Sequence, residues 1–341
     1  MHTVADILIA WYERNGRSLP WRETRDPYRI WLSEVILQQT RVAQGMDYYL
    51  RFTERFPNVA SLAAADEDSV LKLWQGLGYY SRARNLHAAA RQVMEQFGGD
   101  FPEKFEDVRS LRGVGDYTAA AICSMAYDLP CAVVDGNVYR VLGRLFDIEE
   151  PIDTGAGKKL YAALARETLG EAPPAVYNQA IMDFGALACT PTQPACETCP
   201  LTEQCAARAA GTVAQRPVKK GTTKIRDRRF HYLHIVCGDR TVLHRRGAGD
   251  IWQGLYEFPI VETDGDPSAT EAFRRWVGTR WMQHEAVDLP KHQLSHQRIF
   301  ATVHRIEVET FTSEAEVHAV PTAEVDAYAI PRLLERYLES R

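Results

Sequence analysis

The chain has 341 residues, 45% of them apolar and 25% charged, with a formal net charge of -5. This length predicts two domains, and the composition excludes both a disordered chain and a membrane protein, because no stretch approaches ~18 uninterrupted apolar residues. The net negative charge argues mildly against indiscriminate binding to polyanions. Neither a secretory signal nor a transit segment is visible at the N-terminus, so a cytoplasmic location is expected.

Helical periodicity dominates the first part of the chain. Apolar residues recur at every third or fourth position from Val4 to Trp11, as on one face of a helix. Asp26 before Pro27 is typical of a helix cap followed by a first-turn proline, and this second helix is expected to reach about Thr40.

The pattern changes to that of strands after a basic segment. Residues 229–236 and 241–245 predict a β-hairpin, residues 298–310 alternate as a strand does, and Ser268 is expected to cap a short helix between them. The predicted organisation is an all-α domain at 1–213, a basic linker at 214–228 and a smaller α/β domain at 229–341.

The basic segment itself has a strong local charge bias. Residues 216–229 contain seven basic residues and Asp227 as the single acidic one. Such a run is either an ordinary solvated linker or a contact to the phosphates of a polyanion. We expect the segment 216–229 to contact phosphates, with Lys219, Lys220 and Lys224 among the contributing cations.

Two carboxylates stand in positions that suit acid and base chemistry. Glu34 shares a helical stripe with Ile30 and Leu37, and an apolar wall would raise its pKa so that it donates a proton near neutrality. Asp135 follows a short apolar run and opens an amphipathic helix, where backbone amides would keep it ionised unless capping is its whole role. Such a pair can act as the acid and the stabiliser in glycosidic cleavage.

A glycine pair precedes a second helix. Gly113 and Gly115 lie before the alanine-rich run that follows Tyr117. Glycines allow the backbone to approach a polyanion, and free amides at a helix start can hold a phosphate oxygen.

Four of the seven cysteines fall within 17 residues, as Cys189-x6-Cys196-x2-Cys199-x5-Cys205. Four thiolates this close can bind zinc or an iron–sulfur cluster, and the spacing does not choose between them.

These motifs together resemble the MutY family of adenine DNA glycosylases, in the helix-hairpin-helix superfamily. The resemblance is carried by residues 31–41, the glycine turn ending in Tyr117, the sequence Val134-Asp135-Gly136-Asn137, the four cysteines, and residues 19–22, 76–82, 255–259 and 294–296. It implies an all-α helix-hairpin-helix domain with a [4Fe-4S] cluster loop, followed by an α/β Nudix-like domain. It also implies a bacterial, monomeric enzyme, held at the nucleoid through DNA, that excises adenine paired with 8-oxoguanine or guanine in double-stranded DNA and starts base excision repair.

Residue roles follow from the same resemblance. Glu34 would protonate N7 of the flipped adenine, Asp135 would stabilise the oxocarbenium-like sugar, and Tyr117 and Asn137 would hold the site in register. The implied DNA contacts are Arg22 and Gln179 against adenine, Gln39, Leu77 and Tyr79 as wedges in the duplex, Gly113 and Gly115 near the backbone, and Ser295 and His296 at the lesion; the implied cluster ligands are Cys189, Cys196, Cys199 and Cys205.

The sequence departs from the family at two positions. Arg112 stands where the family usually has proline, which should matter little because the bend is expected at Gly113 and Gly115. Leu294 stands where the family usually has phenylalanine, so a ring that could stack near the lesion is absent.

Three other functions compete with this interpretation. A thymine glycosylase or an endonuclease III-like lyase would share the scaffold, but Glu34 and the C-terminal domain count against it, as does the absence of lysine between residues 105 and 157 for a Schiff base. A nucleotide pyrophosphatase would need a glutamate-rich helix for Mg²⁺, and residues 270–276 supply only Glu271. A non-catalytic DNA sensor would have no need for both carboxylates.

Overall fold

The computed structural model describes residues 2–221 and 225–341, and the chain divides into two compact units. The first unit comprises Met1–Ala64 and Asn85–Gly221, and the second comprises Ala65–Arg84 and Thr222–Arg341. The second unit therefore includes a short helical segment from the N-terminal half of the sequence. Lys224 lies outside the described residues, so its predicted phosphate contact has no structural counterpart here.

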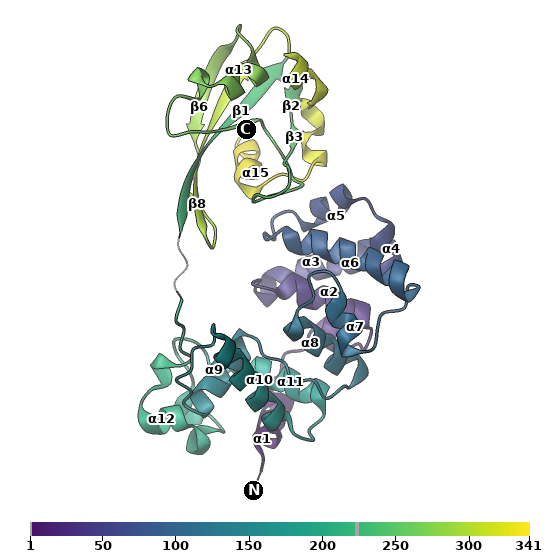
Figure 1. Ribbon diagram of the computed structural model, residues 1–341, viewed down its shortest axis with the longest axis vertical. Helices are drawn as coiled ribbons and strands as arrows, with labels where there is room; N and C mark the ends of the chain where they lie inside the picture. The colour runs from purple at the N-terminus through teal and green to yellow at the C-terminus, as the bar shows by residue number, and fades with distance from the viewer. Residues whose placement is uncertain (1, 222–224) are drawn as a thin grey trace. The chain divides into compact units, whose positions relative to one another are not determined.

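Every regular element described in the first unit is helical (Figure 1). The α-helices are α1 (Val4–Asn15), α2 (Pro27–Leu37), α3 (Val42–Arg55), α4 (Val59–Ala64), α6 (Ser81–Phe97, from Asn85 onward), α7 (Phe105–Ser110), α8 (Asp116–Tyr127), α9 (Gly136–Leu145), α10 (Gly155–Leu169), α11 (Pro174–Leu187) and α12 (Ala206–Ala210). Short 3-10 turns lie at η1 (Pro20–Arg22), η2 (Cys196–Thr198), η3 (Thr202–Gln204) and η4 (Val213–Gln215). The predicted all-α character of this part is confirmed.

Helix α2 is the buried centre of the first unit. The Asp26 side chain accepts a hydrogen bond from Tyr28 N, with Pro27 at the first turn, so the predicted start is confirmed. The expected end near Thr40 is wrong: the helix stops at Leu37, because Gln38 has an extended ψ of 113° and Gln39 a left-handed φ of 57°. Eight of its eleven residues are buried, including the polar Ser33 and Glu34, since α2 packs against both α3 and α8.

The turn before α8 depends on one glycine. Gly113 has a φ of 77°, and a Cβ there would come within 2.7 Å of the Asn85 Cβ atom. Gly115 has a φ of -99° and open space around its Cα, so the expected bend is confirmed at Gly113 and wrong at Gly115. Arg112 is exposed, and its backbone N donates to Gln92.

The second unit is a mixed sheet with helices (Figure 1). Its strands are β1 (Arg226–Cys237), β2 (Arg240–Val242), β3 (His244–Arg245), β4 (Tyr256–Glu257), β5 (Ile260–Glu262), β6 (Met282–Asp288), β7 (His292–Gln293), β8 (Gln297–Glu307) and β9 (Ala319–Pro321). The main sheet has the order β6-β8-β1-β2-β9, with β5 on β1 and β7 on β8, and β3 pairs with β4. The helical elements are α5 (Glu67–Trp74), η5 (Pro267–Ala269), α13 (Glu271–Val277), α14 (Ser313–Val317), η6 (Thr322–Ala327) and α15 (Arg332–Glu339).

Most of the strand predictions hold. β1 and β2 form the predicted antiparallel hairpin, with Val236 opposite Thr241, and β8 runs parallel to β1 along its length. The expected cap at Ser268 is wrong. Asp266 caps the 3-10 turn that contains Ser268, and Thr270 caps α13 by accepting from Phe273 N.

The short helix α5 belongs to the second unit through polar contacts. Arg245 forms an ion pair with Glu67 at 2.8 Å, and the Tyr256 hydroxyl donates to Asp68 at 3.0 Å. Lys72 donates to the Tyr328 carbonyl at 3.1 Å. These contacts tie the segment before α6 to the sheet domain.

Most of the cations in the basic segment are already paired. Arg216 is buried and contacts Asp147 at 2.9 Å, while Arg228 is buried between Asp250 and Glu262, each at 2.6 Å. Arg226 and Arg229 are exposed and pair with Glu262 at 3.7 Å and Asp264 at 3.0 Å. Within residues 216–221 and 225–229, the exposed cations without a carboxylate within 4.0 Å are Lys219 and Lys220. Arg216 and Arg228 are therefore structural, while Lys219, Lys220, Arg226 and Arg229 are exposed and stay the described cations predicted to contact phosphates.

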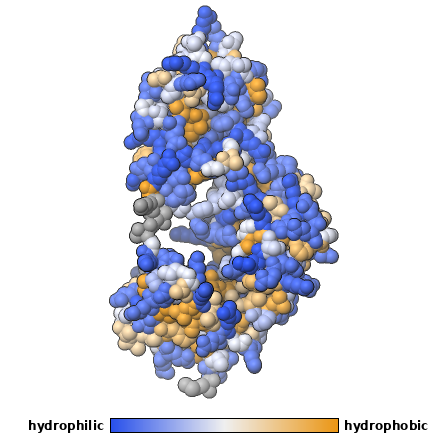
Figure 2. Space-filling view, in the orientation of Figure 1, coloured by the Kyte–Doolittle hydropathy of each residue, from blue (hydrophilic) through white to orange (hydrophobic). Residues whose placement is uncertain are grey.

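The visible surface is mostly hydrophilic, with hydrophobic residues in separate patches (Figure 2). Among the described residues, no helix is both long enough and apolar enough to cross a membrane.

Candidate functional site

A cavity of about 610 Å³ lies among the helices of the first unit. Its wall is formed by η1, the C-terminal part of α2 with the residues after it, and the starts of α8 and α9. Six residues singled out from the sequence line it: Arg22, Glu34, Gln39, Tyr117, Asp135 and Asn137. The fold thus gathers into one cavity side chains that are up to 115 positions apart in sequence.

Glu34 is the buried acid of this cavity. Its side chain is 8% exposed, and its carboxylate oxygen accepts a hydrogen bond of 2.7 Å from the Tyr117 hydroxyl. Burial raises the pKa of Glu34 to about 7; Asp135 adds to the rise, while the Tyr117 hydrogen bond and Arg22 oppose it. The predicted upward pKa shift is confirmed, so Glu34 keeps its proton to a higher pH than an ordinary glutamate does.

Tyr117 stays a hydrogen-bond donor. Burial raises the pKa of its phenol well above the ordinary value, with Glu34 and Asp135 adding to the effect. A neutral phenol can donate to only one acceptor, and Glu34 takes that hydrogen bond.

Asp135 caps α9, as predicted. Its carboxylate accepts from Asn137 N at 2.9 Å, from the Asn137 side-chain amide at 2.8 Å and from Val138 N at 2.8 Å. Burial raises the pKa of Asp135, and these three donors work in the opposite direction. The expectation that amides alone fix its charge is therefore incomplete, because desolvation is the larger effect.

Arg140 holds the side chain of Asn137 in place by hydrogen bonding. Its guanidinium donates to the Asn137 side-chain oxygen at 2.8 Å, to the Gly185 carbonyl at 2.7 Å and to the Cys189 carbonyl at 2.8 Å. The amide group of Asn137 is thereby oriented with its nitrogen toward Asp135.

Two further residues of this region were missed by the sequence analysis. Arg17 lines the cavity beside Arg22, and both guanidiniums bind the fully buried Asp183 of α11. The sequence signal for this site is the carboxylate of Asp183, which stands among apolar residues of a helix. This signal does not identify Arg17 and Arg22 as its partners, because they lie more than 160 positions away in the sequence.

Gln39 and Gln179 lie in different surroundings. Gln39 is exposed and has a left-handed backbone, with a φ of 57°. The Gln179 side-chain oxygen accepts from the Tyr12 hydroxyl at 2.8 Å, and Gln179 is not part of the wall of the 610 Å³ cavity.

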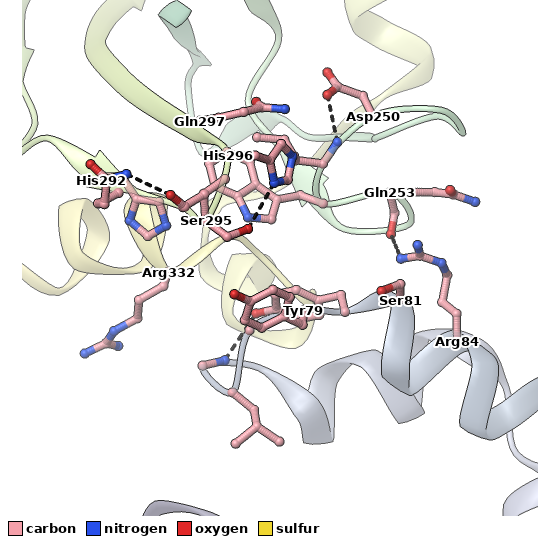
Figure 3. Close-up of a pocket in the computed structure, with 18 of the residues that line it drawn as sticks. Tyr79, Ser81, Arg84, Asp250, Gln253, His292, Ser295, His296, Gln297 and Arg332 are labelled. Carbon is pink, nitrogen blue, oxygen red and sulfur yellow. Dashed lines mark hydrogen bonds between the residues drawn. The ribbon is translucent and has the colours of Figure 1, made fainter. Parts of the chain in front are cut away.

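A second cavity, of about 580 Å³, lies in the second unit (Figure 3). The segment before α6 forms one side, with Leu77 and Tyr79, and the β7–β8 turn forms another, with Ser295 and His296. The Arg84 guanidinium donates to the Gln253 carbonyl at 2.6 Å at its edge. This cavity therefore combines four of the predicted DNA-contacting residues.

The side chains in this second cavity differ in accessibility. Tyr79 is 46% exposed and has a φ of 48°, whereas Leu77 is 6% exposed. A left-handed backbone at a residue other than glycine is uncommon and concentrates at functional sites. Gln39 and Tyr79, both named from the sequence, share this feature.

The β7–β8 turn presents Ser295 and His296. Both are exposed, and the Ser295 hydroxyl lies 3.0 Å from His296 Nδ1. Leu294 N donates to the Gln297 carbonyl at 2.8 Å to close the turn, and the Leu294 side chain packs against the apolar core. Ser295 and His296 therefore offer polar groups at the cavity, while Leu294, which replaces the family phenylalanine, lines the same cavity and packs against the apolar core.

The four clustered cysteines surround one small cavity of about 30 Å³. Arg144, which is 3% exposed, donates to Cys189 Sγ at 3.3 Å and to the carbonyls of Thr190 and Pro191. The four thiols and the adjacent buried cation fit an anionic iron–sulfur cluster, because the guanidinium offsets part of its charge. Among the described residues, no group of three or more His, Cys, Asp or Glu is arranged to hold a metal ion.

Comparison with known proteins identifies both units. Residues 32–164 match the HhH-GPD superfamily of base excision DNA repair proteins, and residues 231–340 match the NUDIX domain. The chain is 31% identical to an adenine DNA glycosylase of Buchnera aphidicola subsp. Schizaphis graminum, across 94% of this chain and 87% of that protein. It is 44% identical to the adenine DNA glycosylase of Mus musculus, across 60% of this chain and 42% of that protein.

Solved structures match the helical part. A thermostable thymine-DNA glycosylase has a TM-score of 0.55 at 28% identity, across 60% of this chain and 95% of its own. A non-covalent endonuclease III–DNA complex has a TM-score of 0.53 at 21% identity, across 61% of this chain and 94% of its own, and this match shows a shared fold alone.

The burial of Glu34 predicts a stabilising substitution. The pKa is about 7 in the folded protein against an ordinary 4.5, so between these values the folded state keeps a proton that the unfolded chain has lost. The free energy of unfolding therefore falls as the pH rises through this window. Glu34→Gln should stabilise the protein above pH 7 by about 1–3 kcal/mol and have little effect below about pH 4. Chemical denaturation across pH measures this.

The matched control is Glu54→Gln on the exposed face of α3. This variant should show no such pH-dependent gain. Equal stability of Glu34→Gln and the wild type at pH 8 would contradict a desolvated carboxyl at position 34.

Proposed function

This chain belongs to the MutY family of adenine DNA glycosylases, and we propose that it hydrolyses adenine from adenine:8-oxoguanine and adenine:guanine pairs in duplex DNA. As an adenine DNA glycosylase it is a hydrolase of N-glycosyl bonds that binds DNA and acts in base excision repair. The observation that carries the proposed mechanism is a buried Glu34 carboxyl, with a pKa near 7, in the same cavity as Asp135.

Glu34 is the proposed general acid. Adenine leaves poorly as an anion, so N7 must gain a proton as the bond between N9 and the sugar carbon C1′ breaks. A carboxyl with a pKa near 7 still carries that proton at neutral pH, whereas an ordinary glutamate has lost it. The Tyr117 hydrogen bond fixes the orientation of the carboxyl group.

Asp135 is the proposed stabiliser of the positive sugar. As the bond to adenine breaks, C1′ becomes cationic and water then adds to it. The three donors from Asn137 and Val138 favour the charged form of Asp135 and hold it in one position. Asn137 therefore contributes by positioning, while Arg22 contributes a donor to the cavity wall.

Gln39, Leu77 and Tyr79 are the proposed wedge residues, which would fill the space that the flipped nucleotide leaves. The exposed side chains and left-handed backbones of Gln39 and Tyr79 support this role. Leu77 is nearly buried and would have to move to reach a base step. The turn at Gly113 and the amide of Gly115 are the proposed backbone contact to phosphate. Gln179 remains a proposed contact to adenine.

Excision should depend on both carboxyl groups. Glu34→Gln should abolish turnover of adenine opposite 8-oxoguanine, a loss of at least about 100-fold, because the proton donor is gone, and Asp135→Asn should do the same because the cation loses its counter-charge. Both variants should still bind DNA. Single-turnover cleavage after alkali, with binding measured by fluorescence anisotropy, tests this.

Glu54→Gln serves as the control for charge loss and should cleave normally. Near-normal excision by Glu34→Gln would refute the assignment. In the same reactions, wild-type enzyme should leave the strand intact until alkali is added and should not be trapped by borohydride, since residues 105–157 contain no lysine to form an imine with the sugar.

We propose a [4Fe-4S] cluster bound by Cys189, Cys196, Cys199 and Cys205. The family is generally iron–sulfur containing, and the four thiols around one small cavity beside Arg144 support the same assignment. The cluster would cross-link the loop between α11 and α12 and so hold a segment that follows the helix carrying Asp183.

Protein purified without air should contain about four irons and four sulfides per chain. Serine substitution of any of the four cysteines should lower this content, while Cys237→Ser, in the second unit, should leave it unchanged. About one zinc per chain and no iron would overturn the cluster assignment.

The second unit is proposed to contact the base opposite adenine. Adenine is a normal base, so safe excision requires that its partner be abnormal. 8-Oxoguanine differs from guanine at N7–H and O8, and the exposed Ser295 hydroxyl can accept from the first or donate to the second. His296 supplies a second polar group beside it.

Ser295→Ala, alone and with His296→Ala, should reduce the preference for adenine opposite 8-oxoguanine over adenine opposite guanine by about fivefold or more. The ratio of single-turnover rates on the two duplexes measures the preference. Ser313→Ala, an exposed serine outside the cavity, is the matched control. Full preference in the double variant would move lesion contact to Gln39 and Tyr79.

We propose that the functional parts are 1–213, 214–228 and 229–341, acting as a monomer in the bacterial cytoplasm on nucleoid DNA. The two family matches, at 32–164 and 231–340, fall within the first and third of these parts and support the division.

A further inference from the structure

Asp183 is the most heavily hydrogen-bonded carboxylate of the first unit. It lies on α11, and its side chain is 0% exposed. It accepts from Arg17 N at 3.0 Å, from Arg17 Nε at 3.0 Å, from a terminal nitrogen of Arg17, and from both terminal nitrogens of Arg22 at 2.7 and 2.8 Å. One buried anion therefore fixes two cations that both line the cavity.

The number of contacts exceeds what a structural ion pair requires. Burying a carboxylate is costly unless it is paired, and two guanidiniums give Asp183 more positive charge than it needs for neutrality. Burial alone would raise the pKa of Asp183, but the hydrogen bonds from Arg22 and Arg17 outweigh it and lower the pKa to about 2. Asp183 is thus charged at any pH at which the protein works.

The alternative partner for these cations is Glu34. Arg22 is close enough to Glu34 for the two charges to interact, and its side chain is 9% exposed, so little water screens that interaction. A guanidinium released from Asp183 would find Glu34 and Asp135 as the carboxylates of the same cavity. Direct pairing with Arg22 would hold Glu34 in its charged form, which cannot donate a proton.

We propose that Asp183 is a positioning residue for adenine excision, which holds Arg17 and Arg22 in the cavity wall and keeps both guanidiniums away from the proton donor Glu34. The catalytic part of this inference rests on the proposed function. The electrostatic part concerns Glu34 alone and can be measured without any reaction.

Other charged groups also face Glu34 and enter the same balance. Tyr117 from α8 donates to it, and Asp135 at the start of α9 repels its charge. The remaining cations of the cavity wall are Arg41, before α3, and Arg140, on α9. Arg140 is held by Asn137, Gly185 and Cys189, so it does not depend on Asp183.

The first measurement is the pH dependence of the stability difference between the wild type and Glu34→Gln. Fitting that difference to one pKa for the unfolded state and one for the folded state gives the folded-state titration midpoint of Glu34, expected near pH 7. In the Asp183→Asn background the midpoint should fall by about one pH unit or more, because the amide cannot compensate two guanidiniums. In the Asp183→Glu background, which keeps the charge, it should stay nearer the wild-type value. An unchanged midpoint with Asp183→Asn would overturn the proposal.

Substitutions of Arg22 test the same claim with Asp183 in place, in case Asp183→Asn does not fold. Arg22→Lys keeps a cation but loses the two-pronged contact, so the freed ammonium should lower the midpoint. Arg22→Met removes the cation and should leave the midpoint at or above the wild-type value. Equal midpoints in these two variants would also overturn the proposal.

The second measurement is the single-turnover rate of adenine excision across pH. For Asp183→Asn the decline on the alkaline side should begin about one pH unit lower than in the wild type, giving about a tenfold slower rate at pH 8 with a smaller loss at pH 6. A purely structural role would lower the rate equally at all pH values, and that result would refute the positioning role. If the wild type excises no adenine, the proposed function fails, while the stability measurement still decides what Asp183 does.

Discussion

The burial of the Glu34 carboxyl group on helix α2 is the constraint on which the rest of the first unit depends. An isolated ionised carboxylate in such a place would lose its hydration, so the group remains protonated to a higher pH or must be paired. In this protein Glu34 receives one neutral hydrogen bond from Tyr117 and no ion pair within salt-bridge distance among the described residues. These surroundings therefore favour the protonated form of Glu34, because no described cation forms a direct ion pair with its charged form.

The other two carboxylates of this region, Asp135 and Asp183, are each stabilised by hydrogen-bond donors of their own. Asp135 has three donors directed at it, which oppose the effect of its burial and favour its charged form, although burial remains the larger effect. Asp183 receives the two cations that would otherwise be drawn to Glu34. The result is one carboxyl group whose pKa is raised to about 7 and another supplied with donors, within a single cavity. Because each group affects the others, substitutions here should not be additive.

In the second unit, ion pairs and apolar packing hold polar groups in fixed positions around a cavity. Arg228 and Arg246 bind Asp250, and Arg246 also binds the buried Glu257, so the loop that lines the 580 Å³ cavity is fixed by ion pairs to the sheet. The β7–β8 turn is fixed by the apolar packing of Leu294. Arg228, one of the cations that made residues 216–229 resemble a DNA-binding linker, is used in this internal framework.

Local sequence determined the features that depend on neighbouring residues. The cap at Asp26, the cap at Asp135, the left-handed glycine at Gly113, the hairpin between β1 and β2 and the burial of Glu34 all follow from side-chain chemistry within a few positions, and the structure has them. The family motifs added the identity of both domains. Errors arose where one position competed with its neighbour, as at Ser268 beside Asp266 and Thr270, or where a left-handed residue ended α2 before Thr40.

Only the tertiary structure decided that Asp183 binds Arg17 and Arg22, that Arg216 and Arg228 are internal, and that residues 65–84 join the second unit. These are pairings between charges far apart in the chain, and a charged residue carries no local sign of its partner, because electrostatic attraction depends on distance in space and on burial rather than on position in sequence.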